Sequence, residues 1–309
     1  MRIFVVGGIN MDIRGISAMP LKQKVRNPGR VVMMPGGVAR NIAENLVNMG
    51  MEVELVTSFG NDNFAEELRR DCIDKGISIK HSVFSEAKSG LYLSVDEYTG
   101  ATFASVSDMD AMEDLSVEHV MGIIDEINSS DACIIEANLG IDVIEYLAEN
   151  VTVPIFADPV SVTKSEKLKA ILPKINAIKP NGAEAASMTG IDLFSEAGVL
   201  VAAEMLVEMG AKRAFVSLGP EGMVYADGVG VGTVPAAHVR VENRSGAGDA
   251  STAAICYAYL MGMDAEQSAI LACKAAGVTI QSEQRVDIDL ERLNKEEEEI
   301  DEIFEELQQ

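Results

Sequence analysis

Short runs of apolar, mostly β-branched residues alternate with longer segments of helical period along most of the chain. Runs of roughly four to eight such residues are typical of buried strands, whereas helices repeat their apolar positions every three or four residues. Their alternation predicts a parallel sheet covered by helices. The expected strands are Arg2–Val6, Glu52–Thr57, Ala132–Ile135, Val153–Ala157, Ala177–Lys179 and Ala214–Leu218, and the expected helices include Ala39–Met49, Phe64–Lys75, Ile141–Asn150 and Gly198–Met209.

Two parts of the chain interrupt this alternation. Residues from about Ile13 to Met34 and from about Ser89 to Ser105 have extended patterns, and the second part contains a hairpin signal with a turn over Asp96–Gly100. These strands predict a small separate sheet. Because ligands of open α/β folds bind beyond the carboxyl ends of the strands, such a sheet could form a lid there. We expect residues 1–309 to form one domain that includes this lid.

The composition is strongly acidic. The 309 residues include 25 Lys and Arg against 49 Asp and Glu, which gives a formal net charge of −24 at pH 7. This field repels nucleic acids and anionic membranes, so neither is expected as a partner, whereas small molecules are. Part of this negative charge comes from acidic residues in the C-terminal tail. Apolar residues of helical spacing there predict a surface helix with one apolar face. These residues are Ile300, Ile303, Phe304 and Leu307.

Cysteine and histidine offer little for metal or disulfide chemistry. The four cysteines contain no CxxC pair, and the three histidines lack metal-ligand spacing. Buried free thiols in a reducing cytoplasm are therefore expected, and a zinc site is not. No apolar stretch reaches the ~20 residues that cross a bilayer, and Met1–Gly8 is typical of a buried strand rather than a signal peptide. The sequence thus predicts a cytoplasmic protein.

The most informative motif is Ser245–Ala250, with the sequence SGAGDA, which leads directly into an apolar helix. Small residues at a helix start allow a ligand to approach the backbone, and the free amides and the helix dipole attract an anion. The motif predicts a phosphate site at Gly246, Ala247 and Gly248 that needs no lysine, with Asp249 beside it. For an isolated motif of this kind, a plain helix-capping role of the acid would be the preferred interpretation.

Two further motifs open helices. Gly36 and Gly37 precede a helix that carries Asn41, and this pattern either exposes backbone to a ligand or simply makes a tight turn. Asn181 and Glu184 have the spacing of a capping box, which needs no function. The carboxylate of Glu184 could also hold a water of Mg²⁺ beside nucleotide phosphates, since Mg²⁺ keeps several waters and few protein ligands.

Asn10 and Asp12 directly follow the first strand, where ligands bind in open α/β sheets, and a carboxylate there suits a vicinal diol. The four motifs in order, GGINMD, PGGVARN, KPNGAE and SGAGDA, resemble the ribokinase-like PfkB family of carbohydrate kinases over essentially the whole chain. The resemblance implies a parallel-sheet α/β/α sandwich with a β-sheet lid. It also implies ATP and Mg²⁺ as cofactors and phosphoryl transfer to an alcohol.

The resemblance implies a role for each matching residue. Asp249 matches the general base of the family, and the three small residues before it match the anion hole for the transferred phosphoryl group. Asn181 and Glu184 match the motif that organises Mg²⁺ and phosphates. The ATP loop is matched by Ser217, Gly219 and Gly222, the sugar-binding positions by Asp12, Gly36, Gly37 and Asn41, and Asn10 and Asn138 are expected to line the same pocket.

Four stretches narrow the resemblance to pseudouridine kinases: Gly36–Leu46, Ala104–Met109, Phe156–Ser161 and Ala275–Glu283. The implied reaction transfers the γ-phosphoryl group of ATP to the 5′-hydroxyl of pseudouridine. A family kinase for another nucleoside or a free sugar is the nearest alternative, and a silent nucleotide or sugar sensor is another. A Rossmann oxidoreductase is disfavoured, because no strand-linked GxGxxG precedes an acid by about 20 residues.

One departure concerns the residues before GAGD. Many family members carry Asp-Thr-Thr there and hold a monovalent cation, whereas this chain has Asn243, Arg244 and Ser245. Activation by K⁺ is therefore not expected, and Arg244 either adds positive charge near the anion hole or lies at the surface. Because strand edges of the lid could pair with a second subunit, a homodimer is expected.

Overall fold

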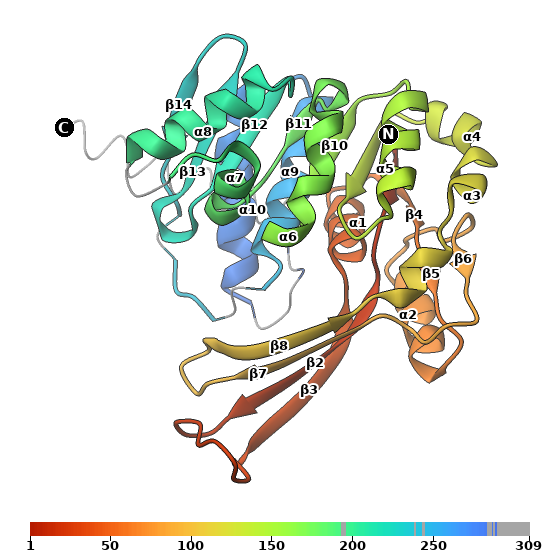
Figure 1. The fold of residues 1–309 in the computed structure, drawn as a ribbon, viewed down its shortest axis with the longest axis vertical. Helices are drawn as coiled ribbons and strands as arrows, with labels where there is room; N and C mark the ends of the chain where they lie inside the picture. Colours follow the sequence, from red (N-terminus) through yellow and green to blue (C-terminus); the bar gives the residue numbers. More distant parts are fainter. Residues whose placement is uncertain (193–195, 238, 243–244, 283–285, 287, 289–309) are drawn as a thin grey trace.

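A central sheet of eight strands organises the molecule (Figure 1). The computed structural model describes residues 1–192, 196–237, 239–242, 245–282, 286 and 288. The strand order is β14-β13-β12-β11-β10-β9-β1-β4, parallel from β12 to β4, with β13 and β14 antiparallel at one edge. The bounds are β1 Arg2–Val6, β4 Glu52–Val56, β9 Ala132–Glu136, β10 Ile155–Asp158, β11 Ala177–Ile178, β12 Arg213–Ser217, β13 Met223–Asp227 and β14 Val231–Val234.

Helices cover both faces of this sheet. Along β1, Ile3 and Val5 belong to the core that also contains residues of α1, α9 and α10, whereas Phe4 and Val6 belong to the opposite core. Because successive strand residues point to opposite faces, one apolar run serves two cores, and the predicted α/β class is confirmed. The α-helices are α1 Val38–Asn48, α2 Asn63–Asp74, α3 Val117–Met121, α4 Ile124–Asn128, α5 Ile141–Asn150, α6 Val162–Ser165, α7 Gly182–Thr189, α8 Glu196–Glu208, α9 Ala247–Leu260 and α10 Ala265–Ile280, and the 3₁₀ helices are η1 Asp110–Asp114, η2 Glu166–Lys174 and η3 Gly219–Glu221.

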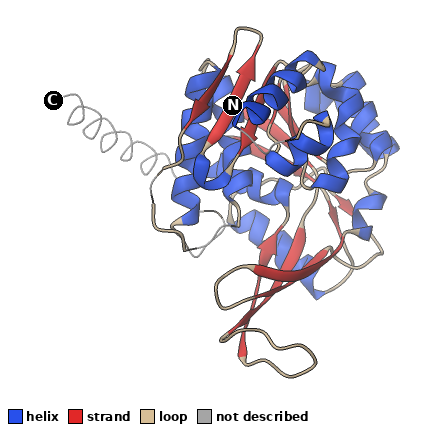
Figure 2. Cartoon of the chain, turned by 60° about the vertical axis from the view of Figure 1, so that its left-hand side comes forward, coloured by secondary structure: helices blue, strands red, loops and turns tan. Residues whose placement is uncertain are grey.

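A second sheet of four strands projects away from the main layers (Figure 2). Its order is β3-β2-β7-β8, and the predicted separate sheet is confirmed. The sheet begins earlier than the extended pattern suggests: Asn10 and Asp12 lie within β2 rather than in a loop after β1. The bounds are β2 Asn10–Ser17, β3 Gly29–Gly36, β7 Leu91–Asp96 and β8 Thr102–Asp108, and a two-stranded sheet joins β5 Ser58–Phe59 to β6 Val83–Phe84.

Three remaining predictions concern the cysteines, membrane spans and the tail. All four cysteines are buried and free. Among the described residues, no helix has the length and apolar character needed to span a bilayer. Ile300, Ile303, Phe304 and Leu307 of the tail, and Asn243 and Arg244 before the GAGD motif, lie outside the described residues.

Candidate active site

The start of α9 places the first backbone amides of a helix next to a carboxylate. Gly246 takes a left-handed conformation with φ 89°, which favours glycine, and among the described residues no side chain caps the helix there. The first amides of a helix have no partner within it, so those that follow Gly246 are available to an anion. Asp249 lies in this first turn. The predicted phosphate site and its neighbouring acid therefore have the expected local geometry.

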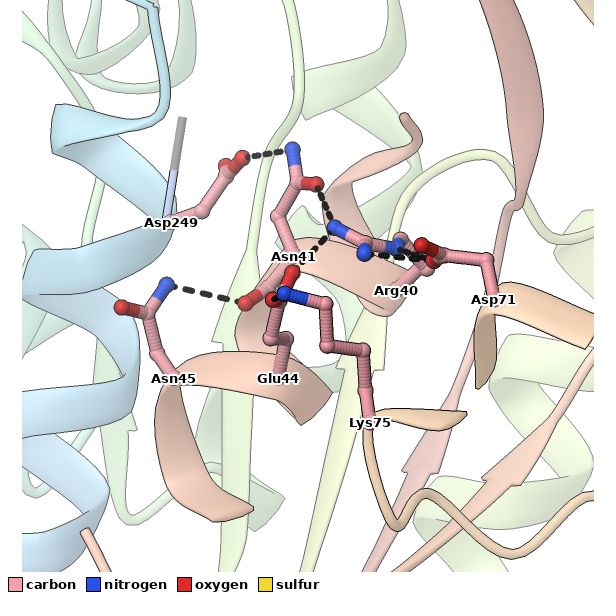
Figure 3. Close-up of polar contacts among 7 residues, drawn as sticks. All are labelled: Arg40, Asn41, Glu44, Asn45, Asp71, Lys75 and Asp249. Carbon is pink, nitrogen blue, oxygen red and sulfur yellow. Dashed lines mark hydrogen bonds and ion pairs between the residues drawn. The ribbon is translucent and has the colours of Figure 1, made fainter. Parts of the chain in front are cut away.

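Asn41 joins this turn to a helix 208 residues earlier in the sequence. Its Nδ2 donates to Oδ2 of Asp249 at 2.7 Å (Figure 3). Asn41 lies one turn inside α1 and is 3% exposed, and the backbone of α1 is further held by the amide of Asn45, which donates to the Asn41 carbonyl at 2.9 Å. The PGGVARN and SGAGDA motifs thus meet at one point.

The two glycines before α1 are explained by close approach. A Cβ on Gly36 would lie 2.2 Å from Oδ2 of Asp12, and a Cβ on Gly37 would lie 2.5 Å from the carbonyl oxygen of Gly8. Gly37 also has φ 104°. Asp12 is buried and accepts from Nδ2 of Asn10 at 2.6 Å. A larger residue at Gly36 would collide with the carboxylate of Asp12, and one at Gly37 would collide with the backbone of Gly8 and Ile9.

Asp12 and Asp249 therefore lie at the same end of α1. Gly36 contacts Asp12 directly before the helix, and Asn41 contacts Asp249 one turn later. A turn of four residues rises about 6 Å along the helix axis. The predicted convergence of the early strand end with the late helix start agrees with these contacts.

A buried lysine stands beside the anion site, contrary to the expectation of a cradle without one. Nζ of Lys179 lies 3.3 Å from Oδ2 of Asp158, and it would lie 3.1 Å from a Cβ on Gly248. The hydroxyl of Thr252 donates to the same Asp158 oxygen at 2.7 Å. Burial alone would lower the pKa of Lys179, but the carboxylates of Asp158, Glu184 and Asp249 outweigh it and raise that pKa. Lys179 is therefore a permanent cation.

The carboxyl group of Asp249 has a pKa close to neutral pH. Part of the residue's surface is exposed, but surrounding protein atoms bury the carboxyl group, and this burial, with the negative charge of Asp158, raises its pKa to about 7. The hydrogen bond from Asn41 and the charge of Lys179 act in the opposite direction. A raised pKa in an aspartate makes it a better proton acceptor than an ordinary carboxylate whenever it is deprotonated.

A second buried carboxylate organises the ends of β1 and β9. Glu136 accepts from the backbone amide of Gly8 at 2.5 Å and from Nδ2 of Asn138 at 2.6 Å. Burial raises the pKa of Glu136 to about 7, although these hydrogen bonds oppose it. The ammonium group of Lys164 donates to Oδ1 of Asn138. A Cβ on Gly7 would lie 2.2 Å from Oε1 of Glu136, which explains a glycine there.

A cavity of about 340 Å³ adjoins the start of α9. Its size is in the range of small-ligand pockets. The predicted residues Ser217, Gly219, Gly222, Ala247 and Gly248 all line it, together with apolar side chains of α10. The cavity thus brings the predicted ATP loop to the predicted anion site.

Asn181 and Glu184 adjoin this cavity through β12. Asn181 forms a parallel bridge with Ser217. The capping box is present. The backbone N–H of Asn181 donates to Oε2 of Glu184 at 2.8 Å, and the backbone N–H of Glu184 donates to Oδ1 of Asn181 at 3.0 Å. The box uses one carboxylate oxygen of Glu184 and leaves Oε1 outside it. Burial raises the pKa of Glu184, and the charge of Lys179 opposes this rise.

This donor set suits a Mg²⁺ that keeps its own waters. Within the described part of the chain, no group of three or more His, Cys, Asp or Glu side chains could hold a metal by itself. A nucleotide-bound Mg²⁺ needs only one or two carboxylates, because phosphates and waters supply the other ligands. The single carboxylate of Glu184 fits this mode.

Comparison with known proteins places this arrangement in a family. Residues 1–290 match the pfkB family of carbohydrate kinases. The chain belongs to the pfkB carbohydrate kinase family. It is similar to the pseudouridine kinase of Escherichia coli (strain K12), with 28% identity over 94% of both chains, and to the guanosine-inosine kinase of Exiguobacterium acetylicum, with 25% identity over 91% of this chain and 95% of that one.

A solved structure supports the fold. The ribokinase of Arabidopsis thaliana, complexed with ribose and ATP, aligns with a TM-score of 0.78 and 18% identity over 95% of this chain and 97% of its own. The ribokinase-like fold is therefore confirmed. As a pfkB family member, the chain is a sugar or nucleoside kinase, that is, an ATP-dependent phosphotransferase.

Several buried charged residues of the candidate site were not predicted from the sequence. They are Arg40, Glu136, Asp158 and Lys179. Asp158 is the last residue of β10, and Lys179 directly follows β11. Their positions at the carboxyl ends of predicted parallel strands were the signal that could have indicated a role in the site. Their mutual distances depend on strand order, which the sequence pattern does not contain.

Proposed function

We propose that this chain is a pseudouridine kinase, which transfers the γ-phosphoryl group of ATP to the 5′-hydroxyl of pseudouridine. The observation that carries the proposal is the position of Asp249. It directly follows Ala247 and Gly248, which line the cavity of about 340 Å³, and it accepts a hydrogen bond from Asn41 near the start of α1. The similarity to a pseudouridine kinase over 94% of both chains supports the choice of nucleoside.

In this mechanism, Asp249 accepts the proton of the attacking hydroxyl as its oxygen bonds to the γ-phosphorus and the bond to the ADP oxygen breaks. The free amides after Gly246, with Ala247 and Gly248, receive the transferred group. Lys179 adds a fixed positive charge at this point. Glu184, with Asn181, would hold the waters of Mg²⁺, which supplies charge neutralisation to the phosphates when bound.

The raised pKa of Asp249 predicts a pH dependence. Below about pH 7 the carboxyl group carries a proton and cannot accept another, so kcat/KM should fall about tenfold per pH unit there and level off above it. The profile of kcat/KM between pH 5 and 9 measures this group in the free enzyme. Activity that stays constant down to pH 5 would contradict the role of Asp249 as the base.

Ribose recognition is proposed for the β2 end and the turn before α1. Asp12 would accept hydrogen bonds from two ribose hydroxyls, with Asn10, Gly36, Gly37 and Asn41 around it. Removing one hydroxyl leaves a buried carboxylate oxygen without its partner, so a 2′-deoxy nucleoside should lose about tenfold or more in kcat/KM. Steady-state kinetics with both nucleosides test this prediction. Equal use of the two would remove Asp12 from the diol site.

The base of the nucleoside is proposed to face Asn138 and the last residues of β8. Asn138 is held by Glu136 and Lys164, so its amide has a fixed orientation. Ser107 and Asp108 lie at the end of β8. Polar groups in fixed orientations discriminate bases well, because a mismatched base leaves them unpaired.

The four-stranded sheet is proposed as the lid and as a dimer surface. In its strand register, Val31, Met33, Leu93 and Val106 share one face and are all exposed, with Val106 at 68%. Asp12 points to the opposite face, so one face could close over substrate and exclude water while the apolar face packs against a second copy. Light scattering that reports a monomer would contradict the homodimer.

A panel of acceptors tests the proposed function. ATP consumption is followed with pseudouridine, uridine, adenosine, ribose and fructose, and the product is identified by phosphorus NMR. We expect the highest kcat/KM and a 5′-phosphate product with pseudouridine. A higher value for another acceptor would assign the chain to another pfkB specificity. Binding of ATP and nucleoside without any product would make it a sensor.

The compartment proposed is the cytoplasm. All four cysteines are buried and free, and burial raises the pKa of Cys72 and Cys133 to about 12. Such thiols are unreactive and fit a reducing compartment.

A further inference from the structure

Arg40 is a buried cation that the mechanism above does not use. It lies on α1 and is 5% exposed (Figure 3). Its Nη1 donates to Oδ1 of Asn41 at 3.1 Å and lies 2.5 Å from Oε2 of Glu44. Its Nε and Nη2 donate to Oδ2 of Asp71 at 3.1 and 2.6 Å, and Lys75 Nζ lies 2.6 Å from the other oxygen of Glu44. The side chains of Asn41, Glu44 and Asp71 therefore hold the guanidinium group in place.

The bond from Arg40 determines which way the amide of Asn41 faces. An arginine side chain has only donors, so it can bond only the oxygen of an amide. With Oδ1 held by Arg40, the NH₂ group of Asn41 faces Asp249 and donates to it at 2.7 Å. The opposite orientation would place the NH₂ group against the guanidinium group and would lose both hydrogen bonds.

We propose that Arg40 is a positioning residue, which acts on Asp249 through the amide of Asn41. The inference rests on the proposed function, because it gives Arg40 a part in the same proton transfer. With its oxygen held, the amide stabilises the carboxylate of Asp249 but cannot accept a hydrogen bond from the protonated carboxyl group. Without Arg40, the amide can turn over and stabilise the protonated form. Arg40 thereby keeps Asp249 in the form that accepts a proton.

Other charged groups also face Asp249. Asp158 on β10 and Glu136 on β9 raise its pKa, as burial does, whereas Lys179 after β11 lowers it. The hydrogen bond from Asn41 is the lowering contribution from α1. Arg40 differs from these groups because its effect passes through the orientation of a neighbouring side chain.

The test replaces Arg40 by Met, which keeps its length and removes its donors. We expect the acidic limb, that is, the low-pH part of the kcat/KM profile in which activity falls, to shift to higher pH by about 1 pH unit. This shift lowers kcat/KM about tenfold at pH 6, while KM for ATP stays within about twofold. Arg40→Lys keeps a donor and should restore most of the loss. An unmoved limb in folded Arg40→Met would overturn the proposal.

Two control variants separate positioning from a structural role. Asp71→Asn weakens the anchor of Arg40 and leaves its bond to Asn41, so it should lower thermal stability without moving the limb. Arg70→Met removes an arginine of an exposed i,i+4 pair with Glu66 and should change neither. If Arg40→Met does not fold, the double variant Arg40→Met/Glu44→Gln removes the facing carboxylate and carries the same expectation for the limb.

An activity-independent measurement separates failure of this inference from failure of the proposed function. Carbon NMR of aspartate-labelled protein, with the Asp249 signal assigned through Asp249→Asn, gives the pKa of that carboxyl group without any substrate. A higher pKa in Arg40→Met supports the positioning role even if no acceptor on the panel is phosphorylated. An identical pKa in both proteins would overturn it.

Discussion

Replacing Asp249 by Asn should lower kcat by about 10²–10⁴-fold and leave ATP binding largely unchanged. General-base assistance typically contributes this factor, and an amide of the same shape cannot accept the proton of an alcohol. Asp249 lies in the first turn of α9, and its neighbours Ala247 and Gly248 line the cavity of about 340 Å³ that is proposed to bind ATP. Turnover measured with saturating ATP and nucleoside, together with calorimetric binding of ATP, checks both parts.

Asp142→Asn is the matched control for this experiment. Asp142 also lies in the first turn of a helix, α5, but it is exposed, and none of the candidate site residues lies on α5. Its replacement should change kcat by less than about twofold. Near-normal turnover of Asp249→Asn would remove the central assignment, whereas an equal loss in both variants would point to a general effect of the substitution.

Replacing Lys179 by Met should destabilise the protein by about 3–5 kcal/mol. Lys179 is 5% exposed and lies 3.3 Å from the equally buried Asp158, and breaking a buried ion pair from one side leaves an uncompensated charge. The same change removes a charge that lowers the pKa of Asp249, so the remaining activity should shift to higher pH. Urea unfolding and the pH profile measure the two effects.

Two variants make the Lys179 experiment specific. Lys169→Met removes a half-buried lysine from an i,i+3 pair with the exposed Glu166 and should leave the stability nearly unchanged, because such surface pairs contribute little. The double variant Lys179→Met/Asp158→Asn removes both charges and should recover part of the lost stability. A loss below about 1 kcal/mol for Lys179→Met alone would show that the buried cluster does not depend on this cation.

The sheet and the local motifs were predictable from the sequence, because they depend on neighbouring residues. The pattern predicted Arg2–Val6 and Ile141–Asn150 with the bounds observed for β1 and α5. The capping box at Asn181 was likewise a matter of spacing along one helix. The periodicity of apolar residues and the capping of helices depend on residues close together in the sequence, so the sequence alone is enough to recognise them.

The buried charges of the site were not predictable in the same way. The anion site was expected without a lysine, yet Lys179 stands beside Gly248. Lys179 directly follows β11 and Gly248 lies in the first turn of α9, far away in the chain, so their proximity depends on the order of strands in the sheet. The raised pKa of Asp249 has the same origin, because burial and Asp158 come from tertiary packing.

A crystal structure of the ternary complex with pseudouridine and a non-hydrolysable ATP analogue tests the central claim most directly. The account predicts the 5′-oxygen within about 2.6–3.2 Å of a carboxylate oxygen of Asp249, with the γ-phosphate at the amides that follow Gly246. It also predicts the ribose hydroxyls on Asp12. A 5′-hydroxyl directed away from Asp249, with the triphosphate outside the cavity at the start of α9, would contradict it.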